Sequence, residues 1–467
     1  MTPYPEYKAT NLPWLPQIPA HWEIVRAKQI FSPIDIRSEK GEEQLLSVSE
    51  RYGVVKREHA NVTMFQAASY EGYKLCWPDD LAINSLWAWS YGLGFSPYHG
   101  IISTAYSVFR LKDKTQCLPR FYDYFVRGKN FHWELRVRSK GLWKSRYQLS
   151  DDAFLAAPML FAPINEQEQI VRYLDSMTAK INKLIRAKKK QIALLQEQKQ
   201  AIINQAVTKG LNPDAEMKDS GIDWLGQIPA KWVVKPLKRV CKVNAGVGHL
   251  SKKLSDDALV TFLPMENISV DGKIDCSQKQ PLKNVKTGFS AFAVNDVVVA
   301  KITPCFENGK GACLDNLDTE IGFGTTELIV LRSFSNQINS QYLYCITMLT
   351  SFRRNGAEVM TGSAGQKRVP ASFIANFTCG IPSLEEQAEI VKYLSTQNAL
   401  FEKLIAEVKK EIEVILEYKN SLIASVVTGQ VDVPNIQVED FDPTDLISET
   451  DDDPTEDDDQ PQEESEE

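Results

Sequence analysis

The sequence predicts an α+β protein in which two globular domains of mixed α/β structure are separated by two long antiparallel helices of a coiled coil and related by an internal pseudo-twofold repeat. Two observations predict this fold. Ten residues near the N-terminus, PWLPQIPAHW at 13–22, return as DWLGQIPAKW at 223–232, displaced by 210 positions. A second pair, EQEQIVRYL at 166–174 and EQAEIVKYL at 386–394, is displaced by 220 positions. Matches at both places indicate two copies of one structural unit.

The second match continues in the same register to the end of each copy. There AVTKG at 206–210 returns as VVTGQ at 426–430, again displaced by 220 positions. Between the matched parts, residues 32–150 and 242–370 share little continuous identity. The pattern therefore indicates a repeated frame that holds two different inserts.

The repeated segments that start at Asn165 and Ser383 have the marks of long helices. Each of these residues can cap a helix together with a glutamate three residues later, and a proline just before each (Pro163, Pro382) disfavours an earlier start. Apolar residues then recur in steps of three and four, the pattern of a seam that packs against another helix. The predicted seam residues are Ile170, Leu174, Met177, Ile181, Leu184, Ile192, Leu195 and Ile202 in the first helix, and Ile390, Leu394, Phe401, Leu404, Val408, Ile415 and Leu422 in the second.

Each helical segment runs for about 43 residues before Gly210 or Gly429, which corresponds to roughly 65 Å. Helices of this kind are not stable alone in water and need a partner. Because an insert separates the two helices along the chain, we expect them to pair antiparallel within one molecule. Pairing with other copies or with unrelated proteins is the alternative.

The tryptophan motifs WLPQIPAHW and WLGQIPAKW begin each repeat. They cannot be helical inside, because Pro19 and Pro229 remove a backbone donor and disfavour helix at the residue before. Aromatic side chains at matching frame positions indicate structural anchors, although they could instead stack on bases. The expected anchors are Trp14, Trp22, Trp224 and Trp232.

Charge is distributed unevenly along the chain. The formal net charge is -8, but residues 439–467 contain sixteen Asp and Glu and no Lys or Arg, so residues 1–438 carry 53 basic and 45 acidic groups. A basic body can neutralise phosphates, whereas so acidic a tail cannot bury a core and is expected to be disordered. The predicted segments are residues 1–160 (first domain), 161–212 (central helix), 213–380 (second domain), 381–435 (C-terminal helix) and 436–467 (acidic tail).

The two inserts share a plan beneath their divergence. Asp80 followed by LAI matches Asp296 followed by VVV, and STAYSVFR ending in Arg110 matches TTELIVLR ending in Arg332. Two strands therefore flank a variable loop in each insert. Different loops on matched scaffolds are expected for two surfaces that recognise different targets.

These loops, and a basic stretch near the end of each insert, suit nucleic acid. Amides, hydroxyls and cations reach base edges, and lysines and arginines hold phosphates. An ordinary solvated loop is the alternative for each single residue. The candidates are Asn84, Ser85, Trp87, Trp89, Ser90, Tyr91, Arg136, Arg138, Lys140, Lys144 and Arg146 in the first insert, and Lys301, Thr303, Asn308, Lys310, Gln366, Lys367 and Arg368 in the second.

The sequence argues against chemistry in the chain itself. No CxxC, HxH or HxxxH spacing occurs, so we predict no metal site. Walker, GxSxG and HExxH motifs are missing, and NPDA at 212–215 lacks the second proline and the aromatic residue of an amino-methyltransferase motif. No apolar run of about eighteen residues and no signal-peptide layout occurs, which predicts a cytoplasmic protein. We expect a non-catalytic binding protein without a cofactor.

Several strings together resemble the specificity subunit of type I restriction-modification systems. They are the repeated IPxxW and EQxxIVxYL, the central TKGLNPDAEMKDSGIDWLGQIPAKW, and the insert strings GTTELIVLR and GSAGQKRVPASFIANFTCGIPSLEEQ. The resemblance covers residues 1 to about 435. It implies that the two domains are target-recognition domains, each reading one half of a split, asymmetric DNA site. It also implies partners: double-stranded DNA, two methyltransferase subunits that carry S-adenosylmethionine, and motor-nuclease subunits that use ATP and Mg, with no membrane involved.

Two recognition domains held apart by a rigid spacer predict an uncontacted gap between the two DNA half-sites, and the helices set the length of this gap. Both half-sites should face one side of the duplex, about 34 Å apart centre to centre. The exposed faces of the helices are candidates for the methyltransferase subunits or for phosphate, although solvation alone could explain their lysines. These are Lys188, Lys189, Lys190, Lys409 and Lys410. The acidic tail departs from the family pattern, and it either keeps the protein soluble or covers the basic groove when DNA is absent.

Two rival classes of protein remain. A coiled-coil scaffold without sequence-specific DNA binding would explain the helices but not the paired inserts. A fused restriction enzyme would need the motifs that are missing. A DNA-recognition subunit accounts for both observations.

Overall fold

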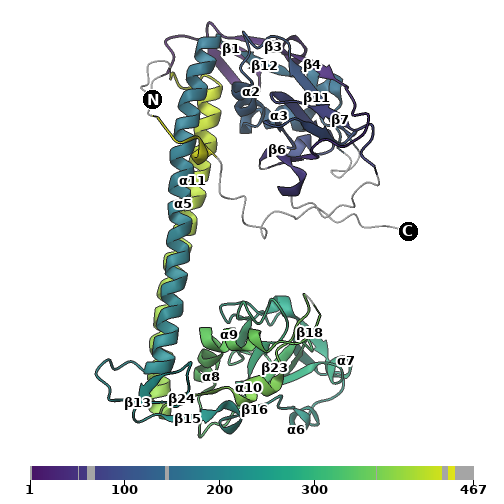
Figure 1. Ribbon diagram of the computed structural model, residues 1–467. Helices are drawn as coiled ribbons and strands as arrows, with labels where there is room; N and C mark the ends of the chain where they lie inside the picture. The colour runs from purple at the N-terminus through teal and green to yellow at the C-terminus, as the bar shows by residue number, and fades with distance from the viewer. Residues whose placement is uncertain are drawn as a thin grey trace. The chain divides into compact units, whose positions relative to one another are not determined.

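The computed structural model describes residues 3–50, 52–59, 69–141, 147–363, 365–433 and 440–446. The chain divides into two compact units: unit 1 comprises Met1–Lys190 and Lys409–Glu467, and unit 2 comprises Gln191–Val408. The two predicted long helices are α5 (Ile164–Lys209) and α11 (Leu384–Val427), and each contributes one part to each unit (Figure 1). No helix in these residues is both long and apolar enough to cross a membrane.

Unit 1 is built around a four-stranded antiparallel sheet. Its elements before α5 are β1 (Tyr7–Leu12), β2 (Leu15–Pro19), β3 (Glu23–Arg26), α1 (Ala27–Ile30), β4 (Phe31–Ile34), β5 (Leu46–Ser49), β6 (Gly53–Lys56), β7 (Lys74–Cys76), β8 (Asp80–Asn84), β9 (Leu93–Phe95), β10 (Gly100–Ile102), β11 (Tyr106–Leu111), α2 (Pro119–Val126), α3 (Lys129–Arg138), α4 (Asp151–Leu155) and β12 (Pro158–Phe161). The sheet has the order β4-β11-β8-β9. Neighbouring residues of a strand point to opposite faces, and both faces are buried: Leu81 and Phe109 enter one core, and Ala82 and Val108 enter another.

Unit 2 repeats this sheet. Its elements between the long helices are β13 (Met217–Asp219), β14 (Gln227–Pro229), β15 (Val233–Pro236), β16 (Cys241–Val243), α6 (Gly248–Ser251), β17 (Leu259–Leu263), β18 (Lys279–Pro281), α7 (Leu282–Val285), β19 (Ser290–Ala293), β20 (Val297–Ala300), β21 (Gly311–Cys313), β22 (Ile321–Gly324), β23 (Leu328–Ser333), α8 (Ser340–Thr347), α9 (Thr350–Glu358), α10 (Ala371–Asn376) and β24 (Thr378–Ile381). The order β16-β23-β20-β21 corresponds to β4-β11-β8-β9. A second sheet of order β18-β17-β22-β19 contains the parallel pair β17 and β22.

The frame around each sheet is also repeated. The hairpin of β1 and β2 corresponds to that of β13 and β14, and the pair β3 and β12 corresponds to β15 and β24. Largely antiparallel strands with separate helices make the chain α+β. The predicted fold class, with two mixed units, two long paired helices and an internal repeat, is confirmed.

The long helices pair in antiparallel order. In unit 1, Ile170 near the start of α5 shares a core with Leu422 near the end of α11. In unit 2, Ile203 near the end of α5 shares a core with Ile390 near the start of α11. The intramolecular pairing that we expected is therefore present.

Ion pairs cross between the two helices at the edge of this seam. Lys188 Nζ lies 2.5 Å from Glu411 Oε2, and Lys199 Nζ lies 3.8 Å from Glu402 Oε1. Lys188 was expected on an exposed face, but its side chain is 26% exposed and committed to Glu411. Of the other lysines in that prediction, Lys190, Lys409 and Lys410 are exposed.

One predicted seam residue is wrong. Leu184 is 45% exposed, whereas its neighbour Ile185 is 8% exposed and joins the core. After Ile181 the seam takes a step of four to Ile185, so a step of three to Leu184 turns the side chain outward. The remaining seam residues are buried (Ile170, Leu174, Ile181, Ile390, Leu394, Phe401, Val408 and Leu422) or half-buried (Met177, Ile192, Leu195, Ile202, Leu404 and Ile415).

The repeated tryptophan and EQ motifs meet at each end of the frame. Trp22 and Trp232 are almost fully buried, and their indole N–H groups donate to Glu166 Oε2 (2.9 Å) and Glu386 Oε1 (3.0 Å). The anchor role expected for these two tryptophans is therefore confirmed. Ser383 caps α11 as expected, because its Oγ accepts the backbone N–H of Glu386, whereas the Glu386 carboxylate accepts from the tryptophan. Helix α5 begins one residue before the predicted cap Asn165.

The glutamine of each EQ motif connects the frame to the insert by hydrogen bonds to backbone groups. Gln167 and Gln387 have no exposed surface. Each accepts one backbone N–H, from Leu118 or Asn339, and donates to two backbone carbonyls. These positions explain why the motif recurs, since an apolar substitute would remove the partner of the same three backbone groups in each unit.

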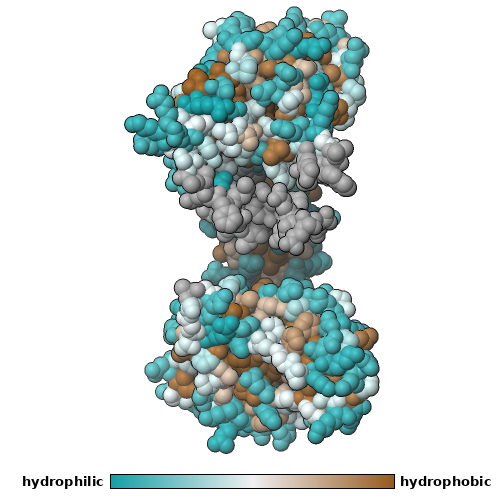
Figure 2. Space-filling model, turned by 90° about the vertical axis from the view of Figure 1, so that its right-hand side faces the viewer, coloured by the Kyte–Doolittle hydropathy of each residue, from teal (hydrophilic) through white to brown (hydrophobic). Residues whose placement is uncertain are grey.

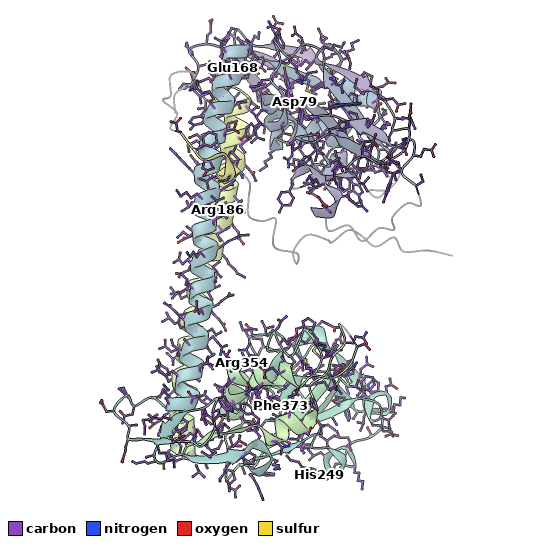
Figure 3. The ribbon with its side chains drawn as sticks, viewed as in Figure 1. Asp79, Glu168, Arg186, His249, Arg354 and Phe373 are labelled. Atoms are coloured by element: carbon purple, nitrogen blue, oxygen red, sulfur yellow. The ribbon has the colours of Figure 1, made fainter. Side chains whose placement is uncertain are left out.

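A short C-terminal segment lies on α5 within unit 1. Asn182, which is buried, donates to the backbone carbonyls of Asp445 (3.0 Å) and Leu446 (3.2 Å), and Arg186 forms an ion pair with the Asp445 carboxylate (Figure 3). Lys419 of α11 donates to Asn182 Oδ1 (2.9 Å). Part of the segment predicted as a disordered tail therefore has a docking place, and residues 447–467 lie outside the described part of the chain.

Candidate nucleic-acid interface

A buried Asp–Arg pair forms the base of the variable hairpin in each unit. Asp80 at the start of β8 receives two hydrogen bonds from Arg110 of β11 (2.7 and 2.8 Å). Asp296, just before β20, receives two from Arg332 of β23 (2.8 and 2.6 Å). Both aspartates are 1% exposed, and the hydrogen bonds to them raise the pKa of each arginine. Two parallel charge-assisted bonds keep the strands in register, so the loop between β8 and β9, or between β20 and β21, starts from a rigid place.

In unit 1 the two predicted regions come together. The β8–β9 loop, which contains the short 3-10 helix Ala88–Ser90, packs against α3 and against the chain that follows it. Leu149 N donates to Ser85 O (2.9 Å), and the Tyr147 ring lies edge-on to Trp89 with centroids 6.1 Å apart. The residues 84–91 and the described part of 136–148 therefore form one continuous surface, hereafter the unit 1 surface.

Aromatic rings dominate the unit 1 surface. Trp87 and Trp89 stack with centroids 5.7 Å apart and planes at 26°. Tyr91, which adopts a positive φ of 62°, stacks on His132 of α3 at 4.0 Å. Half-exposed aromatic faces of this kind can stack on bases or pack against sugar rings.

The structure sorts the predicted residues of unit 1 into three groups. Asn84 and Ser85 are only 8% and 5% exposed and bond within the unit, so they support the loop and do not offer their side chains to base edges. Arg138 is held 2.6 Å from Glu134, whereas Arg136 and Lys140 are exposed and make no ion pair in the described part of the chain. Lys144 and Arg146 lie outside the described residues. Ser90 donates to Glu50 Oε2 at 3.1 Å.

In unit 2 the corresponding regions also come together. Thr303 N donates to Lys367 O (3.0 Å), and Val369 N donates to Lys301 O (2.8 Å). The β20–β21 loop and the stretch 366–368 thus run side by side, although more than 60 residues separate them in the chain. We refer to this region as the unit 2 surface.

Amides and cations dominate the unit 2 surface. Asn308, Gln366 and Lys367 are exposed, and Lys301 and Thr303 are half-exposed. Lys301 and Lys367 make no ion pair in the part of the chain that the structure describes. Lys310 donates to Met265 O (3.0 Å) and Arg368 is clasped by Glu327 (2.9 Å), so these two predicted residues shape the loop. The hydrogen bond from Arg368 lowers the pKa of Glu327, which is consistent with a stable ion pair.

Both units present largely hydrophilic surfaces with apolar patches between polar side chains, on the face shown in Figure 2.

Sequence reasoning missed several residues of the two surfaces: Glu50, His132 and Tyr147 in unit 1, and Glu327 and Arg353 in unit 2. One signal could have found two of them. Phe131-His132 and Phe352-Arg353 occupy the same place after equivalent helices, but they differ too much in sequence to align by identity.

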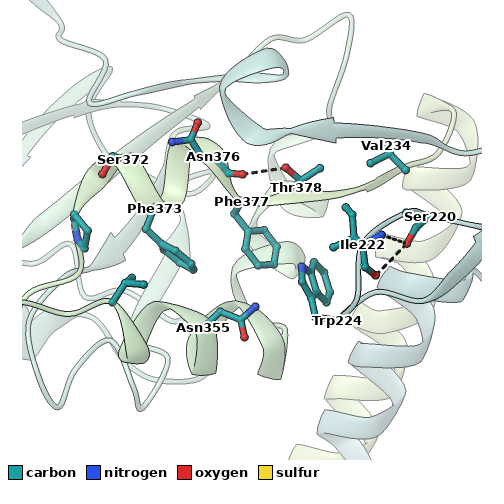
Figure 4. A pocket seen from close by; sticks show the side chains of 13 residues that line it. Ser220, Ile222, Trp224, Val234, Asn355, Ser372, Phe373, Asn376, Phe377 and Thr378 are labelled. Carbon is teal, nitrogen blue, oxygen red and sulfur yellow. Dashed lines mark hydrogen bonds between the residues drawn. The ribbon is translucent and has the colours of Figure 1, made fainter.

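The tryptophans Trp14 and Trp224 differ between the repeats. In unit 1 the Trp14 indole N–H donates to Glu134 Oε1 (2.8 Å), and its ring packs against Phe125 and Phe131. In unit 2 Trp224 stacks on Phe377 (centroids 4.9 Å apart) and lines an open depression of about 690 Å³ (Figure 4). Both rings pack within their own unit, and Trp14 joins its repeat motif to helices of the insert, in agreement with the anchor role.

Comparison with known proteins finds a family that matches part of the chain. Residues 229–414 match the family described as the type I restriction modification DNA specificity domain. The type I restriction enzyme EcoAI specificity subunit of Escherichia coli is 34% identical over 236 residues, which cover 50% of this chain and 39% of that protein. The MjaVIII specificity subunit of Methanocaldococcus jannaschii is 23% identical over 351 residues, covering 72% of this chain and 76% of that protein. The match to the first relative thus spans about two fifths of its length.

The fold has a counterpart among solved structures. A chain from a structure of complex assembly and conformational transition of the type I R-M system aligns with a TM-score of 0.63 at 15% identity, over 89% of this chain and 99% of that chain. The same two-unit fold is thus present at low identity. The repeated frame, the paired helices and the matching specificity domain make this chain similar to type I restriction-modification specificity subunits.

Proposed function

We propose that this chain is the DNA sequence-specificity subunit of a type I restriction-modification complex and reads a bipartite, asymmetric DNA site. One observation carries the proposal. The same sheet, closed by the same Asp–Arg pair, presents a different surface in each unit. Equivalent scaffolds with different exposed side chains are suited to reading two different half-sites.

The two surfaces suggest different modes of reading. On the unit 1 surface Trp87, Trp89 and Tyr91 offer apolar and stacking contacts, and Arg136 and Lys140 supply positive charge for phosphates. On the unit 2 surface Asn308, Gln366, Lys301 and Lys367 offer amide and ammonium donors, which suit base edges in the major groove. Lys144 and Arg146 are proposed as further phosphate contacts.

We assign no catalytic role to the chain and propose that its partners perform the chemistry in the cytoplasm. Two methyltransferase subunits would carry S-adenosylmethionine, and motor-nuclease subunits would use ATP and Mg. The candidates for docking such subunits are exposed apolar residues on the long helices, since apolar side chains that gather into a patch mark interaction surfaces. These residues are Leu184, Leu194, Tyr393, Leu400, Val414, Leu416 and Tyr418. We also propose the domain limits 1–160 and 213–380 for the two target-recognition domains.

Methylation mapping tests the proposal directly. The chain is expressed with the methyltransferase subunit encoded beside it, and the host DNA is sequenced for modified adenines. A single split motif with a fixed gap is the expected result and supplies both half-sites. Methylation that ignores this chain, or that is absent although the complex is stable and the partner active, would favour the coiled-coil scaffold instead.

A further inference from the structure

One side chain in each unit reaches from a helix to the underside of the variable hairpin. Phe131 in α3 and Phe352 in α9 are both fully buried, at equivalent places after α2 and α8. The next residue is His132 in unit 1 and Arg353 in unit 2. Both contact the hairpin of their own unit just before its second strand.

Arg353 packs directly under the β20–β21 loop. Gly309 of this loop has a φ of 78°, and a Cβ atom added there would lie 2.7 Å from Arg353 Nη1. The loop backbone can approach the guanidinium this closely because the residue is glycine. Arg353 Nη2 also donates to Gln200 Oε1 of α5 (2.5 Å) and to Met348 O (2.8 Å). The side chain therefore joins the hairpin, α9 and the long helix α5.

Among the residues that the structure describes, none supplies an acidic partner for the charge of Arg353. It forms no ion pair in the described part of the chain, and its Nε is buried without a hydrogen-bond partner. Burial lowers the pKa of the guanidinium. A cation kept in such a place costs free energy that a neutral side chain would avoid, so its fork of donors is expected to have a role in holding the loop.

His132 holds the corresponding hairpin by other means. Its Nε2 lies 2.5 Å from Trp89 O, and its ring stacks on Tyr91. Both contacts are to residues of the β8–β9 loop. The two units thus use one helical position for one task with different chemistry.

We propose that Arg353 and His132 are positioning residues that determine sequence specificity by holding the recognition hairpin of their own unit, without touching the bases. This inference rests on the proposed function. It assigns Arg353 to one half-site and His132 to the other. Arg353 additionally fastens its hairpin to α5, the helix that belongs to the frame.

The test uses the assembled methyltransferase complex with a library of DNA sites in which each half-site is varied separately. Arg353→Gln is expected to lower discrimination in one half-site by about tenfold, the scale of one base contact, and to leave the other half-site unchanged. His132→Gln is expected to do the reverse. Arg353→Lys, which keeps the charge but loses the planar fork, is expected to restore discrimination only in part.

Arg354→Gln is the matched control. Arg354 is the exposed neighbour of Arg353 on α9 (Figure 3), and its substitution removes the same charge without disturbing the hairpin. We expect it to leave discrimination unchanged. The slope of affinity against salt should also be unchanged in Arg353→Gln, because a lost phosphate contact would lower that slope by about one.

Each remaining outcome has a definite meaning. A slope lowered in Arg353→Gln would assign the residue to phosphate and overturn the positioning role. An equal loss of discrimination in both half-sites, or a loss matched by Arg354→Gln, would also overturn the positioning role. So would unchanged discrimination in Arg353→Gln, provided that the wild-type complex is selective. A wild-type complex without sequence preference would overturn the proposed function and this inference with it.

Discussion

The frame and the hairpins of this molecule obey different constraints, although each unit contains both. In the frame, several equivalent residues repeat both identity and contacts: Trp22 and Trp232 donate to glutamates at the same place in the two EQ motifs. In the hairpins the hydrogen bonds to the aspartate at the base repeat, but the exposed loops differ: the unit 1 surface is aromatic and the unit 2 surface carries amides and cations. Buried polar groups need particular hydrogen-bond partners, which restricts the residues that the frame accepts. Exposed loops on a rigid base carry no such restriction and can differ in sequence.

The largest expected effect comes from shortening the frame while leaving both hairpins intact. Deleting residues 190–196 together with 404–410 removes one heptad from each helix and retains the pairs Lys188–Glu411 and Lys199–Glu402. We expect the methylated motif to keep both half-sites and to shorten its gap. Deleting 190–196 alone serves as control, because it puts the helices out of register. An unchanged gap after the double deletion would show that the helices do not set it.

Breaking the base of one hairpin should destabilise that unit. Asp296→Asn leaves Arg332 beside a neutral group where a buried carboxylate accepted two hydrogen bonds, and we expect a loss of about 3 kcal/mol in the free energy of unfolding. Chemical denaturation with probes in each unit measures the effect. Asp80→Asn is the matched change in unit 1. If both variants unfold like the wild type, the pair does not hold the strands.

Acidification should affect one hairpin more than the other. Burial lowers the pKa of His132 from its ordinary value of 6.5; nearby Arg136 lowers it further, while the Trp89 carbonyl and Glu50 raise it. The folded state therefore favours the neutral His132 ring. The stabilisation that this neutral ring gives the folded state is lost as pH falls below about 6.5. We expect discrimination in the half-site of unit 1 to fall a few fold between pH 7.5 and 5.5, with that of unit 2 constant. A pH effect that persists in His132→Gln would point to another group.

The smallest expected effect concerns the C-terminal segment on α5. Arg186→Gln removes the ion pair with Asp445, and because both side chains are partly exposed we expect a loss of only about 0.5–1 kcal/mol in stability. DNA affinity and its salt dependence should not change when residues 439–467 are removed. Tighter binding after that removal would instead support a tail that covers the basic surface.

Sequence reasoning reached further in the frame than in the surfaces. The repeat, the antiparallel helices and the matched strands at Asp80 and after Asp296 were all predictable, because periodicity and identity mark them directly. The prediction of the seam failed at Leu184. A pattern of steps of three and four does not say which of two adjacent apolar residues, Leu184 or Ile185, faces the other helix. In the loops, residue type alone could not separate exposed Lys367 from Arg368, which Glu327 neutralises.

The sequence by itself determined the repeated frame and the α+β class, since these depend on local periodicity and on residues that recur at fixed spacing. Only the tertiary structure decided which polar side chains face solvent and which are used internally. Asn84 and Ser85 were drawn into hydrogen bonds across the sheet, and His132 and Arg353 were brought under hairpins more than 40 residues away. Partners so distant in the chain leave no local pattern, because the contact is created when the sheet and helices pack.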